Sequence, residues 1–264
     1  SDPRDPRGMG ASGMVGGPVL VVGRRPGVGA ARIAPMESAR LSGDRPAGDG
    51  HNSRRIGADE LVPGRPCTDP GLYAADRGLL AYMLQDVRAL VRLAQDGVVE
   101  VEEYEPIVWF VHGLKRRIVP CRLPRLLDGR DLEVVGFFGS RRQATGGSPV
   151  AGEDSIDALD RDLTTEFKYH PGICSYSTIE MIDGFWANLV LHEVPSDTED
   201  WRSNHVHRGA VALSPDLYRD VRIHNGRLSG GVNSNHEIVL NHTKYWDYGP
   251  EVGAEPTWMA WRKL

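Results

Sequence analysis

Hydrophobic residues recur at helical spacing along residues 69–97. Asp69 and Pro70 are residue types favoured at the start of a helix, and Gly97 is typical of a helix end. The pattern therefore predicts one long amphipathic helix. A second, shorter helix is expected over residues 105–117, which read EPIVWFVHGLKRR. The apolar residues of the first helix lie three and four positions apart, on one helical face; they are Leu72, Leu79, Leu80, Met83, Val87, Leu90, Val91 and Ala94.

From residue 132 onward the pattern changes to short apolar strands that alternate with helices. Asp183–Gly184 separates two apolar runs and predicts a hairpin turn. The predicted order is β-α-β-β-α-β, which is the ferredoxin-like split βαβ unit of an α+β protein. Strands are predicted over residues 132–142, 173–182, 185–194 and 218–228, and helices over residues 152–172 and 196–213.

The chain divides into three predicted parts. Residues 1–68 contain many Gly, Pro and charged residues and few apolar ones, so we expect a flexible N-terminal region. Residues 69–130 form a helical extension, and residues 131–264 form the ferredoxin-like domain with an aromatic-rich C-terminal tail. Three of the six tryptophans lie in this tail, where we expect them to cover the sheet, a pocket or a partner subunit; they are Trp246, Trp258 and Trp261.

Strand alternation assigns side chains to the two faces of the predicted sheet, because successive residues point in opposite directions. In residues 185–194, the row of Phe185, Ala187, Leu189 and Leu191 is apolar and is expected to meet the two helices. In residues 218–228, we expect Val221 and Ile223 to face the helices as well. The opposite, free face then collects polar and aromatic side chains from three strands: Tyr176, Thr178, Trp186, Asn188, His192, Arg222 and His224.

This mixture is typical of a small-molecule pocket, which combines aromatic walls with a few fixed polar groups. His192 and His224 are the candidate bases, because an imidazole can remove a substrate proton at neutral pH. Arg222 and Asn188 are expected to stabilise the resulting anion. The alternative is an open sheet face in contact with water. The substrate-binding candidates are Tyr176, Trp186, Thr178, Trp201 and His205.

Composition excludes several other classes of function. The net charge is −5, whereas nucleic-acid-binding proteins usually present a basic face, so no nucleic-acid partner is expected. No apolar run reaches the ~18 residues of a membrane span. Cys67, Cys121 and Cys174 form no CxxC motif, which argues against a disulfide framework and favours a reducing cytoplasm. No metal site is predicted, because the histidines in the last third of the chain match no compact motif.

The sequence around the second predicted helix resembles one known group of proteins. An acidic segment, SDTED, precedes Trp201, and NHVHR follows it. Within residues 133–231 this pattern is similar to the dimeric α/β-barrel superfamily, which includes antibiotic-biosynthesis monooxygenases and their relatives. The resemblance implies a homodimer in which two ferredoxin-like units pair their free sheet faces around a small organic substrate.

The resemblance also implies a function, with alternatives left open. The expected activity is an oxygenase of bacterial secondary metabolism acting on an aromatic or polyketide-like substrate, although relatives include cyclases and lyases. The cofactor is either none or heme, with His192, His205 or His224 as the axial ligand in the heme case. The third alternative is a small-molecule binding module without catalysis.

Overall fold

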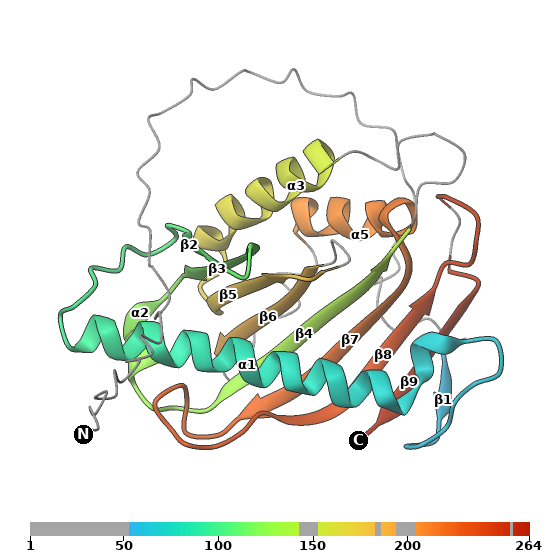
Figure 1. Cartoon of the computed structure of the whole chain (residues 1–264), viewed down its shortest axis with the longest axis horizontal. Helices are drawn as coiled ribbons and strands as arrows, with labels where there is room; N and C mark the ends of the chain where they lie inside the picture. The colour runs from blue at the N-terminus through green and yellow to red at the C-terminus, as the bar shows by residue number, and fades with distance from the viewer. Residues whose placement is uncertain (1–52, 143–152, 183–185, 194–203, 254–255) are drawn as a thin grey trace, which may run out of the picture.

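In the part of the chain that the structure describes, nine strands form one mixed sheet with helices on both sides (Figure 1). The computed structural model describes residues 53–142, 153–182, 186–193, 204–253 and 256–264. The strands lie in the order β1-β9-β8-β7-β4-β6-β5-β3-β2; β1 and β9 are parallel, and all other neighbours are antiparallel. The strands are β1 Arg54–Ile56, β2 Ile107–Val111, β3 Leu114–Pro120, β4 Leu132–Arg141, β5 Ile173–Glu180, β6 Trp186–Glu193, β7 Tyr218–Leu228, β8 Val239–Asp247 and β9 Trp258–Lys263. The helices are α1 Pro70–Gln95, α2 Leu123–Leu127, α3 Glu153–Glu166 and α5 His205–Leu217, with 3₁₀ turns at Pro66–Thr68 and Phe167–Tyr169.

Helix α1 confirms the long helix predicted from the apolar spacing. The Asp69 side chain caps it by accepting a hydrogen bond of 2.7 Å from the Gly71 backbone N–H. Figure 1 shows α1 lying across the strands. Its apolar side, which includes Leu80, Leu84 and Val87, is buried in the main core against Leu189 and other residues of the sheet.

The second predicted helix, over residues 105–117, is wrong. These residues form the hairpin β2–β3, which joins the sheet through pairing of β3 with β5. The turn consists of His112 and Gly113, which both have positive φ (50° and 81°), as the tight turn of a two-residue hairpin requires. The preceding run, IVWFV, is rich in the β-branched and aromatic residues that favour strands.

The elements predicted from residue 132 onward are confirmed wherever the structure describes them. In chain order they are β4, α3, β5, β6, α5 and β7, and their strands are neighbours in the order β7-β4-β6-β5. The expected turn at Asp183–Gly184 and residues 196–203 of the second predicted helix lie outside the described residues.

The two ends of the described chain add strands that were not predicted. Residues 53–68, expected to be flexible, contain β1 and a 3₁₀ turn. The C-terminal tail forms β8 and β9, which lengthen the sheet beyond β7. Its tryptophans lie within these two strands and are half-buried.

The sheet has two faces, which we name by the helices that lie on them. On the α1 face, Phe138 pairs in register with Ala187 on one side and with Arg222 on the other. On the α3/α5 face, Phe137 pairs with Asn188 and with Ile223. Ion pairing of Asp160 in α3 with Arg117 in β3 helps to hold α3 on the second face.

Candidate functional site

The residues predicted to share one site lie on opposite faces of the sheet. Arg222 and His224 lie on the α1 face, whereas Asn188 and His192 lie on the α3/α5 face. The predicted grouping of these four residues on one face is therefore wrong. The error lies in β6: its apolar row of Ala187, Leu189 and Leu191, expected to meet the two helices, packs against α1 instead. Val221 and Ile223 lie toward α3 and α5 as expected, so Arg222 and His224 lie on the α1 face.

On the α1 face, four side chains form a buried polar network between α1 and the sheet. Arg222 donates two hydrogen bonds to the carboxylate of Asp76, from Nε at 2.7 Å and from Nη2 at 3.0 Å. His224 Nε2 lies 2.9 Å from Asp76 Oδ2, and His224 Nδ1 lies 2.8 Å from Thr243 Oγ1. Burial acts to raise the pKa of Asp76, but the hydrogen bonds from His224 and Arg222 outweigh it and lower the pKa overall.

This network holds α1 on the sheet and leaves His224 no route to a substrate. The His224 ring has 0% exposure, and both of its nitrogens are engaged. Phe138 and Tyr73 pack against it edge-on, with ring centroids 5.3 and 5.9 Å away. The geometry therefore supports a structural role for His224 and Arg222.

Sequence reasoning missed Asp76, although the sequence carried a signal for it. Asp76 stands four residues after Leu72 and four before Leu80, which places an acid within the apolar stripe of α1. A carboxylate at such a position is expected to have a cationic or hydrogen-bonding partner in the core.

On the α3/α5 face, Tyr176 and Thr178 contact an ion pair that the sequence analysis also missed. Arg117 donates to Thr178 Oγ1 from Nε (3.1 Å) and Nη2 (3.0 Å), and its Nη2 also donates to Asp160 Oδ1 at 2.7 Å. The guanidinium lies 5.4 Å from the centre of the Tyr176 ring. Burial, reinforced by the charge of Asp160, raises the pKa of Tyr176. Arg117 was missed because it fell in the wrongly predicted helix.

Asn188 occupies the middle of the same face with an unsatisfied acceptor. Its Oδ1 atom is buried and has no hydrogen-bond partner among the residues that the structure describes. Its direct neighbours in register are Thr178 on β5 and Phe137 on β4. Phe137 packs edge-on against Tyr218, with ring centroids 5.4 Å apart. A buried carbonyl oxygen beside aromatic rings is a favourable position for a hydrogen-bond donor.

His192 lies on the same face as Asn188, four residues further along β6. The side chain is buried, and this burial lowers its pKa from 6.5 to about 4, so the ring is neutral at pH 7. Four residues of a strand span about 13 Å. One small ligand therefore does not contact both side chains.

The other predicted binding residues are dispersed. Trp186 is half-buried on the α3/α5 face, with Lys115 Nζ 5.8 Å from its ring centre. His205 is the first residue of α5 and is exposed. Trp201 lies outside the described residues.

The histidines do not fit the heme alternative. An axial ligand needs one available ring nitrogen beside a wide apolar space. His224 uses both nitrogens inside the network, His192 is buried, and His205 is exposed at a helix end. Within the described ranges, no cluster of three or more His, Cys, Asp or Glu side chains could hold a metal ion.

Burial suppresses the reactivity of all three cysteines. They carry free thiols, and burial is the main cause that raises each pKa, for Cys67 and Cys174 to about 12. Cys174 is fully buried on β5, which indicates a structural thiol. Among the described helices, none is long and apolar enough to cross a membrane.

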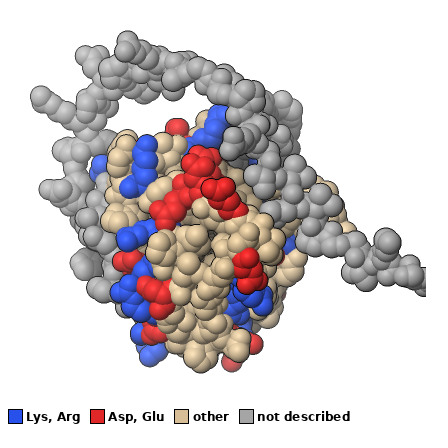
Figure 2. All heavy atoms as spheres, turned by 90° about the vertical axis from the view of Figure 1, so that its left-hand side faces the viewer, with Lys and Arg blue, Asp and Glu red and all other residues tan. Residues whose placement is uncertain are grey.

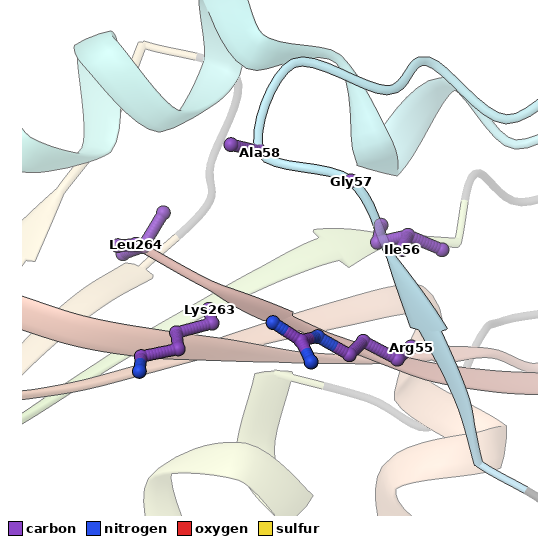
Figure 3. A pocket seen from close by; sticks show the side chains of 6 residues that line it. All are labelled: Arg55, Ile56, Gly57, Ala58, Lys263 and Leu264. Atoms are coloured by element: carbon purple, nitrogen blue, oxygen red, sulfur yellow. The ribbon is translucent and has the colours of Figure 1, made fainter.

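A hollow of about 450 Å³ lies far from Asn188, at the edge of the sheet formed by β1 and β9 (Figure 3). Its lining consists of Arg55, Ile56, Gly57, Ala58, Lys263 and Leu264, and it includes none of the predicted site residues. We therefore place the candidate site at Asn188.

Comparisons with protein-family models, curated proteins and solved structures gave no match to this chain.

Proposed function

We propose that the protein binds a small, planar aromatic molecule on the α3/α5 face of its sheet, next to Asn188. The observation that carries this proposal is the buried, unsatisfied Oδ1 of Asn188 beside Phe137. Leaving a buried acceptor without a donor costs about 1–3 kcal/mol. A ligand O–H or N–H group at this position would recover that free energy.

The surrounding side chains support an apolar, flat ligand. Along β4 and β6, residues toward α1 are buried, whereas most residues toward α3 and α5 are half-buried. The half-buried apolar residues include Val135, Phe137, Trp186 and Val190. Apolar and aromatic side chains around a few polar groups are typical of small-molecule sites.

The arrangement favours binding over the proton-abstraction mechanism of the expected oxygenase. His192 lies about 13 Å from Asn188 along β6. Arg222 and His224 lie behind the sheet, in the network with Asp76. We therefore propose the binding-module alternative as the function of this face.

We also propose that the segment from β4 to β7 is a ferredoxin-like unit. The chain order β4-α3-β5-β6-α5-β7 and the spatial order β7-β4-β6-β5 support this assignment. In the barrel proteins that the sequence resembles, the face opposite the two helices pairs with a second subunit. In this chain α1 lies over that face and would replace the second subunit there.

The test is ligand binding to the purified protein and to two matched variants. The probes are 2-naphthol and related hydroxylated naphthalenes, with binding measured by tryptophan fluorescence and by thermal shift. Asn188→Leu removes the acceptor, and Asn241→Leu changes an exposed amide on β8 as the control. We expect Asn188→Leu to raise Kd about tenfold, equivalent to ~1.4 kcal/mol, and the control to leave it unchanged.

Two results would contradict the proposal. One is the absence of any saturable binding across the set of naphthols. The other is an equal affinity of the Asn188→Leu and Asn241→Leu variants. Oxygen consumption measured with the bound naphthol would instead support the oxygenase alternative.

A further inference from the structure

The two edge strands of the sheet differ in how they are protected against pairing with another strand. At one edge, β1 is three residues long and carries Arg54 and Arg55. At the other edge, β2 reads IVWFV, and no described strand pairs with its outer side. Short length and charge are common protections of sheet edges, and β2 has neither charge, proline nor bulge.

The hairpin geometry determines which backbone groups of β2 point outward. In a hairpin with a two-residue turn, the residues that flank the turn exchange hydrogen bonds with each other. Val111 pairs in this way with Leu114, so Ile107, Trp109 and Val111 direct their N–H and C=O groups toward β3. The N–H and C=O groups of Val108 and Phe110 consequently point outward.

The side chains of β2 fix the strand in place and leave an apolar surface at the edge. Trp109 is 9% exposed and belongs to the main core on the α1 face. On the opposite side, Phe110 is 62% exposed and Val108 is half-buried. An ordered strand with an exposed apolar edge is a template for β-strand addition.

We propose that β2 pairs with β2 of a second copy of this chain, antiparallel, about a two-fold axis at Trp109. In this register, Val108 of each copy stands opposite Phe110 of the other, and Ile107 stands opposite Val111. Every cross-strand pair is apolar, and the outward N–H and C=O groups of Val108 and Phe110 meet those of the other copy. A surface that is complementary to itself in this way favours an isologous dimer.

The charges around β2 favour this antiparallel arrangement. The loop before β2 carries the exposed acids Glu102, Glu103 and Glu105. Figure 2 views this side of the molecule and shows both acidic and basic side chains on it. The other end of β2 leads to His112 and Lys115. Antiparallel pairing separates the two acidic loops by the length of the strand, roughly 17 Å, and brings each toward the basic end of the other copy.

The test is sedimentation velocity of the full chain from about 1 to about 200 µM, where small interfaces associate. We expect a reversible monomer–dimer equilibrium. Val108→Pro removes an outward N–H without removing a hydrogen bond to β3, and it should weaken the dimer about tenfold or more. The matched control, Val108→Ala, keeps the N–H and should retain the dimer.

If Val108→Pro does not fold, a second variant and a second measurement still test the proposal. Phe110→Lys places two like charges near the two-fold axis and should also yield monomers. Hydrogen exchange of the peptide containing β2 should show protection that disappears on dilution. The proposal is overturned if the chain is monomeric at all concentrations, whether or not the β2 amides are protected. It is also overturned if the dimer persists unchanged in both Val108→Pro and Phe110→Lys.

Discussion

Burial of His192 makes the stability of this protein depend on pH in a defined range. Burial lowers the pKa of His192 from 6.5 to about 4, so between these values the unfolded chain binds a proton that the folded chain does not. Stability is therefore fully present above pH 6.5 and is lost as the pH falls toward 4. Between pH 7.5 and 4.5, this one side chain lowers the unfolding free energy by about 2.5 kcal/mol. That is a large part of the roughly 5–15 kcal/mol by which proteins are typically stable.

The experiment is urea unfolding followed by tryptophan fluorescence at pH values from 7.5 to 4.5. His192→Gln keeps a polar side chain of similar size but removes the titration. The difference in unfolding free energy between wild type and this variant should shift by about 2.5 kcal/mol across the range. Other titrating groups largely cancel in that difference.

The matched control is His205→Gln, because His205 is exposed at the start of α5. Its unfolding free energy should follow the pH dependence of the wild type. A wild-type and a His192→Gln curve that run parallel from pH 7.5 to 4.5 would refute the argument, because His192 would then titrate alike in both states.

Two further predictions concern the packing of α1 and the sheet. Asp76→Ala leaves the buried guanidinium of Arg222 without its closest carboxylate. We expect it to lower the unfolding free energy by about 3–5 kcal/mol, measured by urea denaturation. A loss below about 1 kcal/mol would refute the role of the network in stability. Gly226→Ala places a methyl group 2.4 Å from the Val239 carbonyl oxygen and should cost about 1–3 kcal/mol. Its counterpart Gly78→Ala, in an open position on α1, should raise stability by about 0.5–1 kcal/mol in thermal unfolding, and equal effects of the two substitutions would contradict this reasoning.

The elements that were predicted correctly are those specified by local sequence. Helix α1 has its cap at Asp69, its helical spacing and its terminating Gly97 within one continuous segment. The hairpin β2–β3 was mistaken for a helix because a five-residue apolar run is too short to show which period it follows. His112 is a residue type seldom recognised as part of a tight turn.

The candidate site depended on relations that one strand cannot specify. The alternation of side chains along β6 predicts that Asn188 and His192 share a face of the sheet. It does not determine which side chains of β7 lie on that same face. That choice depends on the register of β4 with both neighbours, which places Arg222 beside Phe138 and Asn188 beside Phe137. The partners of Asp76 are equally remote, since Arg222 lies 146 residues away in sequence.

This separation between Asp76 and Arg222 has a consequence during protein synthesis. At roughly 5–20 residues per second, a ribosome needs about 7–30 s to add the 146 residues between them. For most of that interval α1 is complete, while Arg222 and His224 of β7 and Thr243 of β8 have not been made. A nascent chain stalled before β7 therefore carries an acid within the apolar stripe of α1 while the Arg222 guanidinium that pairs with it has not been made.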